Sequence, residues 1–137
     1  MLSNLPAPIV GTINSIALIF NTIISCTPLF AFALLKILPI KPLQKICTLI
    51  CIKIAEAWIA INSAVLGSTQ KTQYNITGDL NDIKYDGWYM VVANHQSWAD
   101  IFILQKIFNK QAPFLKFFLK KELIYVPVIG LAWWALD

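Results

Sequence analysis

The chain has 137 residues, about one domain's worth, of which 58% are hydrophobic and 13% are charged. A typical soluble domain has about 45–50% apolar and about 25% charged residues. The composition therefore excludes intrinsic disorder and argues against an ordinary soluble globule. The net charge is +4 and all 11 basic residues are lysine. Because nucleic-acid recognition relies on arginine, no nucleic-acid partner is expected, and an anionic membrane surface fits this basic, apolar chain better.

The first predicted element is a helix over residues 9–35. This uncharged stretch is longer than the roughly 20 residues that a helix needs to cross hydrocarbon. It has no preceding basic region and exceeds the apolar part of a signal peptide, so a cleaved leader is not expected. Pro28 predicts a kink or a break. Asn14, Asn21 and Ser25 share one helical face, which is either a set of harmless polar positions or a stripe that meets a partner helix.

Residues 43–66 predict a second helix of similar length. Lys45, Glu56 and Ser63 fall on one face while the other faces are apolar, which suits a helix lying at a membrane interface. A proline-containing turn separates the two helices, and lysines cluster around it. By the positive-inside rule, the turn and the chain after it should face the cytoplasm. We therefore expect residues 1–67 to form a membrane-associated helical hairpin.

The composition changes after the hairpin, and residues 68–137 predict strands that alternate with helices. Short apolar runs rich in β-branched and aromatic residues are typical of buried strands. In chain order the expected elements are a strand at 74–77, a strand at 88–93, a helix at 98–108 closed by Asn109 in the left-handed conformation, a strand at 114–118 and two short helical pieces within 119–137. This order predicts an α/β fold class.

The only histidine, His95, follows the strongest strand candidate and lies five residues before Asp100. On one continuous helix the two would be about 140° apart and could not meet. If the helix begins at Trp98, His95 lies on the preceding loop and can fold back toward Asp100. Asp100 would then hold one imidazole tautomer and leave the other ring nitrogen free as a base. In the alternative, Ser97 and Asp100 form a capping box and His95 is structural.

The chain offers no partner for covalent or metal chemistry at this position. No serine or cysteine pairs with His95 at a nucleophile elbow, and there is neither a glycine-rich phosphate loop nor a second histidine. Cys26, Cys47 and Cys51 are odd in number and contain no C-x-x-C pair, so buried, reduced thiols are expected. His95 is therefore expected to act as a base on a substrate hydroxyl, without a metal or a bound cofactor.

Residues 91–100, which read Val-Val-Ala-Asn-His-Gln-Ser-Trp-Ala-Asp, resemble the His-x4-Asp block of the glycerolipid acyltransferases. Among these, they are most similar to the bacterial 1-acylglycerol-3-phosphate (lysophosphatidic acid) acyltransferases. The resemblance continues through residues 113–123 and 126–137. It implies that His95, oriented by Asp100, deprotonates the free hydroxyl of a lysophospholipid, which attacks the thioester of acyl carrier protein or coenzyme A. It also implies an acyltransferase-like sheet with flanking helices, at the cytoplasmic face of a bacterial inner membrane.

The sequence departs from the family in its later blocks. A Gly/Phe-x-x-Arg segment and a Glu-Gly-Thr-Arg segment are absent, so Lys116, Lys120 and Lys121 are the possible phosphate ligands, with solvated surface lysines as the alternative. We expect residues 68–137 to be the N-terminal portion of a longer α/β acyltransferase domain. Two other hypotheses stay open: a non-catalytic membrane-anchored remnant, and a hydrophobic hairpin interaction protein, for which no strand is expected at 88–93.

Overall fold

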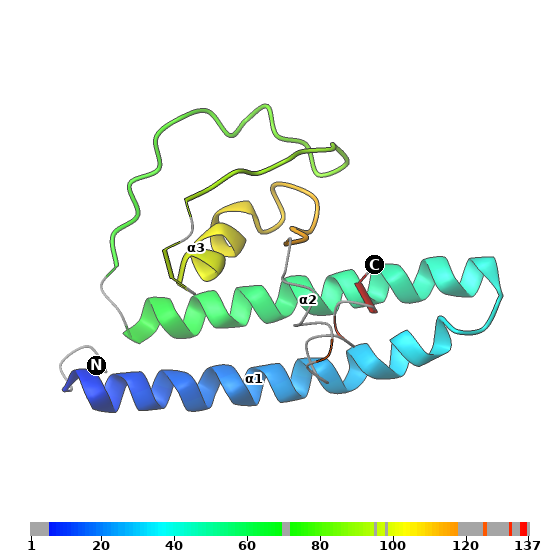
Figure 1. Ribbon diagram of the computed structural model, residues 1–137, viewed down its shortest axis with the longest axis horizontal. Helices are drawn as coiled ribbons and strands as arrows, with labels where there is room; N and C mark the ends of the chain where they lie inside the picture. Colours follow the sequence, from blue (N-terminus) through cyan, green and yellow to red (C-terminus); the bar gives the residue numbers. More distant parts are fainter. Residues whose placement is uncertain are drawn as a thin grey trace. The chain divides into compact units, whose positions relative to one another are not determined.

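The computed structural model describes residues 6–69, 72–94, 96–97, 99–117, 125, 132 and 135–136. In chain order its helices are α1 (Ala7–Leu35), α2 (Lys41–Thr69) and α3 (Ala99–Phe108), as Figure 1 shows. The chain divides into two compact units, one of residues 1–18 and 59–115 and the other of residues 19–58 and 116–137. Each of the two long helices contributes one part to each unit.

The two long helices confirm the predicted helical segments. Both are long and apolar enough to cross a membrane, by length and composition. Pro28 lies inside α1, which continues through it, so the predicted interruption is not a break in the helix. At the end of α2, the Ser68 and Thr69 hydroxyls donate to the carbonyl oxygen of Val65 at 2.8 and 3.0 Å. These bonds satisfy a carbonyl of the last turn, and α2 runs three residues past its predicted end at Leu66.

Polar side chains join α1 and α2 in the unit of residues 19–58 and 116–137. Asn21 Nδ2 donates to the carbonyl oxygen of Trp58 at 3.1 Å, and Trp58 Nε1 donates to Thr22 Oγ1 at 3.1 Å. Ser25 Oγ lies 3.5 Å from Asn21 Oδ1 on the same helix. Of the two interpretations of the polar stripe on the first helix, the one in which it meets a partner helix is confirmed for Asn21. We call Asn21, Thr22, Ser25, Glu56 and Trp58 the polar seam.

Glu56 is buried within the same unit, with 3% of its surface exposed. Its carboxylate pairs with Lys53 Nζ at 2.8 Å, and the side chain of Lys53 is 66% exposed. Meanwhile Ile46 and Leu49, on the predicted apolar faces of α2, are 55% and 61% exposed. The acidic residue of this helix thus turns inward, and these branched apolar residues turn outward.

Several polar residues of the two long helices are therefore buried, while many of their large apolar residues are exposed. Asn14 and Asn62 are 5% and 2% exposed in the unit of residues 1–18 and 59–115. By contrast, five large apolar residues of α1 are between 54% and 64% exposed: Ile16, Ile19, Phe20, Ile23 and Ile24. A helix pair in water shows the opposite distribution. Helices in hydrocarbon associate through small and polar side chains and leave their apolar surface to the lipid.

Small residues form much of the apolar core of the second unit. Leu29, Ala33, Cys51 and Ala135 are its buried members, and Cys51 Sγ approaches the carbonyl oxygen of Leu29 at 3.9 Å. Cys26 is half-buried, and none of the three cysteines forms a disulfide. Small side chains at this contact allow the two helix backbones to approach closely.

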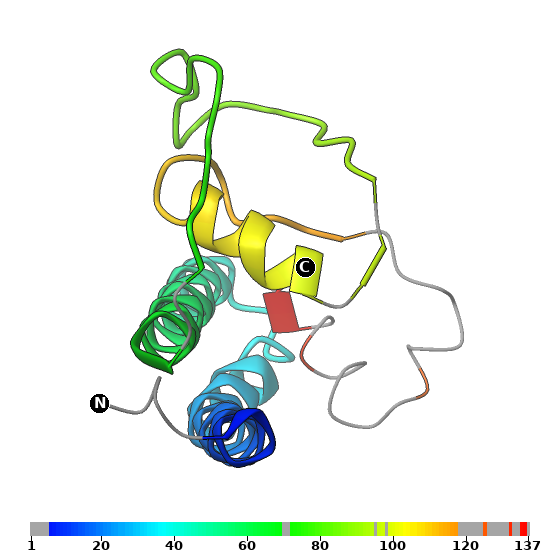
Figure 2. The same cartoon turned by 90° about the vertical axis from the view of Figure 1, so that its left-hand side faces the viewer.

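No β-strand occurs among the described residues, so the predicted α/β fold class is wrong. The strongest strand candidate, residues 88–93, is irregular, and its side chains Trp88, Met90 and Val92 are 99%, 81% and 84% exposed. Residues 74–77 and 114–117 are also irregular; Phe118 and most of residues 119–137 lie outside the described residues. A strand is stable only when a neighbouring strand pairs with its backbone, and these runs do not pair. Figure 2 shows residues 72–94 as an irregular trace leading toward α3.

The third helix, α3, lies within one residue of its predicted bounds. Lys110, with φ of 64°, adopts the left-handed conformation that the sequence predicts for Asn109. The backbone N–H groups of Gln111 and Ala112 both donate to the carbonyl oxygen of Phe108 at 3.1 Å. The helix therefore ends with a left-handed residue, as predicted, but this residue is one position later than expected.

Candidate functional site

The described residues of the predicted reactive segment lie at the start of α3. Gln96 and Ser97 are not helical, and the first helical residue is Ala99. Ser97 Oγ accepts a hydrogen bond from the Ala99 N–H at 3.2 Å, and the Ser97 carbonyl accepts one from the Asp100 N–H at 3.1 Å. Gln96 and Ser97 thus belong to a loop ahead of the helix, as the predicted approach of His95 to Asp100 requires.

The carboxylate of Asp100 draws this loop back onto the first turn of α3. Its Oδ2 accepts hydrogen bonds from the backbone N–H groups of Gln96 at 2.7 Å and of Ser97 at 2.8 Å. The bond to Ser97 is the reciprocal half of a capping box, in which the side chain three residues after the N-cap reaches back to the N-cap backbone N–H. The capping interpretation of Asp100 is therefore confirmed. The two charge-assisted hydrogen bonds to Oδ2 also hold the Asp100 carboxylate in one position at the start of α3.

The structure places only part of the predicted site. His95 and Trp98 lie outside the described residues, so the contact between His95 and Asp100 stays a prediction. Lys116 is exposed, and Lys120 and Lys121 fall on residues that the structure does not describe. Within the described part of the chain, no group of three His, Cys, Asp or Glu side chains could hold a metal ion.

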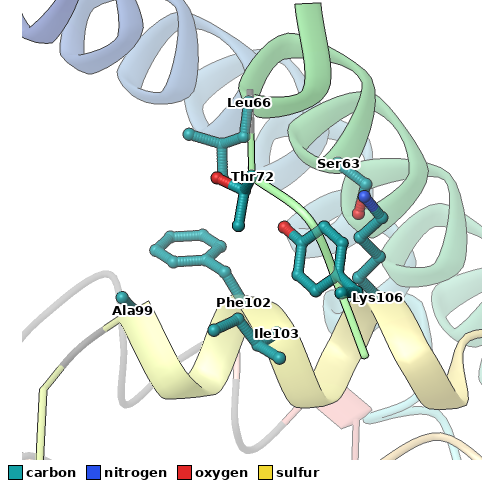
Figure 3. A pocket seen from close by; sticks show the side chains of 8 residues that line it. Ser63, Leu66, Thr72, Ala99, Phe102, Ile103 and Lys106 are labelled. Carbon is teal, nitrogen blue, oxygen red and sulfur yellow. The ribbon is translucent and has the colours of Figure 1, made fainter. Parts of the chain in front are cut away.

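A pocket of about 350 Å³, which the sequence did not reveal, lies along α3. Figure 3 shows Phe102 and Lys106, one turn apart, rising from α3 beside it. From α2 and the segment after it come Ser63, Leu66, Thr72 and Tyr74. From α3 come Ala99, Phe102, Ile103 and Lys106. The only sequence signal is the spacing of the α3 residues, which places them on one helical face. Because Ala99 precedes Asp100, one end of the pocket adjoins the candidate site.

Comparison with known proteins assigns a chemistry to this half of the chain. Residues 73–137 match the family model described as Acyltransferase. Neither the curated proteins nor the solved structures gave a match. The matched segment contains His95 and Asp100, begins after α2, and includes the blocks at residues 91–100, 113–123 and 126–137 that carry the resemblance. It supports acyl transfer in general as the chemistry of this segment, and hence a transferase.

The family match also weighs against one of the open hypotheses, the hydrophobic hairpin interaction protein, and leaves the non-catalytic remnant open. A hydrophobic hairpin interaction protein would have no strand at 88–93, and the structure agrees with it on that point. That hypothesis gives no reason, however, for an acyltransferase match over residues 73–137. An acyltransferase segment following two long apolar helices accounts for both halves of the sequence.

Proposed function

We propose that the chain is a membrane-associated 1-acylglycerol-3-phosphate acyltransferase of phospholipid biosynthesis. It would transfer a fatty acyl group from acyl carrier protein or coenzyme A to the free hydroxyl of the lysophospholipid. The observation that carries this proposal is the acyltransferase match over residues 73–137, with His95 and Asp100 at His-x4-Asp spacing inside it. The substrate, the thioester donor and the two residue roles go beyond the match itself.

In the proposed reaction His95 acts as the general base. Its neutral imidazole nitrogen takes the proton of the acceptor hydroxyl while that oxygen attacks the thioester carbonyl carbon. The tetrahedral intermediate collapses, the C–S bond breaks, and the departing thiolate takes the proton back from the imidazolium. Asp100 would stabilise the imidazolium and orient the ring. No acyl-enzyme intermediate is required, which agrees with a sequence that places no serine or cysteine at a nucleophile elbow with His95.

The lysines of this chain are the candidate ligands for the acceptor phosphate, because the chain contains no arginine. Lys116, Lys120 and Lys121 follow α3 in sequence, and Lys116 is exposed. A lysine ammonium binds phosphate as a point charge, without the bidentate geometry of arginine. We therefore expect these contacts to supply charge neutralisation and little orientation.

The hairpin supports a location at the membrane, where both the acceptor and the product are found. Two helices with exposed apolar residues and buried polar ones suit hydrocarbon. If both helices crossed the bilayer, Lys36, Lys41 and Lys45 at the turn would lie on the opposite side from residues 73–137. The positive-inside rule favours the cytoplasm for lysine-rich turns. We therefore propose that the hairpin lies in one leaflet, with residues 73–137 on the same, cytoplasmic, face of the bacterial inner membrane.

Acyl transfer in vesicles tests the proposal. The chain, alone and fused to the arginine-containing C-terminal half of a related acyltransferase, is given 1-acylglycerol-3-phosphate and a labelled acyl thioester. We expect phosphatidic acid from the fused chain, its loss in His95→Ala, and little turnover from the chain alone. A fused chain that folds and turns over equally well with His95→Ala would disprove the role of the histidine. Robust activity of the chain alone would assign phosphate binding to the lysines.

A second substitution separates catalysis from capping. Asp100→Asn keeps an oxygen that can accept from the Gln96 and Ser97 N–H groups, but it removes the charge that would stabilise the imidazolium. We expect the rate to fall by about a hundredfold or more, since general-base steps contribute about 10²–10⁴. Asp86→Asn, which removes an exposed carboxylate outside the block, is the control. A near-normal rate in Asp100→Asn would leave the residue with its capping role alone.

A further inference from the structure

The pocket along α3 is chemically distinct from the proposed catalytic block. One part of its wall is apolar, formed by Leu66 of α2 and by Phe102 and Ile103 of α3. Among the described lining residues, Lys106 is the one with a charge, and no carboxylate lines the pocket. A site with an apolar wall and a cation accepts an amphiphile with an anionic head.

Lys106 is held in position by an aromatic ring. Its Nζ lies 4.1 Å from the centroid of the Tyr74 ring, within the range of a cation–π interaction. This contact uses the face of the ring and leaves the ammonium N–H groups able to donate to oxygen atoms. The hydroxyls of Ser63 and Thr72 line the same pocket. Together these groups provide one positive charge and several donors, which is the composition of a headgroup site.

The size of the pocket limits what it can enclose. Its volume of about 350 Å³ is near the lower end of ligand sites, which span about 300–1,000 Å³. At roughly 30 Å³ per water-sized group, it holds on the order of a dozen heavy atoms. A whole phospholipid or a coenzyme A thioester is much larger. A phosphate-containing head with the first carbons of its chain fits, and the remaining chain must lie outside.

The wall contributed by α2 indicates where the remaining chain goes. Leu66 belongs to α2, one of the two helices that are long and apolar enough to cross a membrane. A lipid whose tail lies against α2 in the bilayer can place its head in the pocket without carrying the tail through water. A free phosphate ion gains nothing from Phe102 and Leu66. The apolar wall therefore favours a bilayer lipid over a soluble anion.

We propose that this pocket binds the headgroup and upper chain of an anionic phospholipid from the surrounding membrane. The inference rests on the membrane association in the proposed function and is independent of the acyl transfer. In this proposal Lys106 selects anionic over zwitterionic lipid. The His-x4-Asp resemblance assigns no role to this residue. The lipid occupies a site beside Asp100, where it would also steady the start of α3.

Lipid retention tests the proposal with a matched pair of lysines. The full chain is inserted into vesicles of phosphatidylcholine with phosphatidylglycerol, extracted in mild detergent, and its bound lipids are counted by native mass spectrometry. Lys106→Gln is compared with Lys110→Gln, which removes the same charge one turn later, outside the pocket lining. Ile103→Phe, which adds volume to the apolar wall, is the second variant, and circular dichroism checks that each variant keeps its helices.

The wild-type chain should retain phosphatidylglycerol over phosphatidylcholine by about fivefold, the effect of one lysine near an anionic surface. Lys106→Gln should lose this preference, Lys110→Gln should keep it, and Ile103→Phe should lower total retention. Inorganic phosphate should displace little lipid. Equal losses in the two lysine variants, or displacement by inorganic phosphate alone, would overturn the proposal. A chain that binds no vesicles would overturn it together with the membrane association, whereas normal vesicle binding without dependence on Lys106 overturns it alone.

Discussion

The two long helices and the segment of residues 73–117 expose apolar side chains for different reasons. On α1 and α2 the exposed residues form continuous helical faces, while polar residues such as Asn21 and Glu56 are buried. In the later segment, Trp88 and Val92 are exposed on an irregular run that lacks a pairing strand among the described residues. The first pattern is an organised surface that a bilayer can cover, because backbone groups within a helix are already bonded to one another.

The comparison shows what a helix and a strand each require. A helix satisfies its backbone locally, so α1 and α2 form from their own residues and need a partner only for the polar seam. A strand satisfies its backbone only through another strand. The one regular element among the described residues 72–117 is α3, whose first turn is bonded to its own loop through Asp100. The regular structure in this region therefore depends on hydrogen bonds between residues that are close together in the sequence.

The largest effect, labelling that is either present or absent, is expected in a test of which side of the membrane the hairpin turn lies on. Single cysteines at Lys41 and Lys110, both exposed, are introduced into a chain whose three native cysteines are replaced by alanine. A maleimide that cannot cross membranes should label neither position in sealed cells and both in opened cells. This result places the turn and the later segment on one side. Labelling from opposite sides would show that each helix spans the bilayer.

An effect of at most a few hundredfold is expected when a carboxylate is placed on the apolar face of α2. Ile46→Asp is compared with Ile76→Asp, since the two isoleucines are 55% and 52% exposed in the two regions. A charge inserted into a membrane helix costs about 2.5–3.5 kcal/mol at the centre and less toward the interface. Co-sedimentation with vesicles should fall for Ile46→Asp and stay unchanged for Ile76→Asp. Equal behaviour would mean that the exposed face of the hairpin does not contact lipid.

An effect of about 1 kcal/mol is expected at the start of α3. Asp100→Ala removes the acceptor for two backbone N–H groups, and loss of an N-terminal cap costs about 0.5–2 kcal/mol. Hydrogen exchange at Gln96 and Ser97 should accelerate several-fold, while Asp100→Asn should retain protection. Asp79→Ala is the control, because Asp79 Oδ1 accepts from the Asn81 N–H at 2.8 Å in an exposed turn outside α3. Unchanged exchange in Asp100→Ala would contradict the cap.

The smallest effect is expected in the polar seam. Trp58→Phe and Thr22→Val each remove one partner of the 3.1 Å hydrogen bond between the helices. Interhelical hydrogen bonds in membranes average about 0.6 kcal/mol. Unfolding of the two single variants and the double variant in detergent should give a coupling energy of about this size. Strict additivity would show that the bond contributes nothing to the association of α1 with α2.

The sequence predicts the helices well and the sheet badly. The uncharged stretch ending before Lys36 marks α1 closely, and a partner helix is one of the two interpretations that the shared face of Asn21 and Ser25 offers. Both depend on residues a few positions apart. The strand at 88–93 depends on pairing with distant residues, which an apolar run cannot guarantee. Residue type alone favours Asn109 over Lys110 for the left-handed position. In the structure Lys110 adopts this conformation.

The candidate site is predictable in part for the same reason. The bonds between Asp100 and the loop span three and four residues, so the Ser-x-x-Asp spacing is enough to expect the cap. The pocket combines residues near 63–66, 72–74 and 99–106. No spacing rule connects three segments so far apart. The role of His95 depends on the placement of one ring, which sequence spacing alone does not fix.

The polar seam has a consequence for how the protein is made. Until α2 is complete, the bond from Asn21 to the Trp58 carbonyl cannot form, and Glu56 is not yet packed within its unit. From Leu35 to Thr69 the ribosome adds 34 residues, which takes about 2–7 s at roughly 5–20 residues per second. α1 therefore emerges from the ribosome that much earlier than α2, before the bonds between the two helices can form. Biosynthesis therefore favours a translocon or chaperone that holds the first helix and releases the two into the bilayer as a pair.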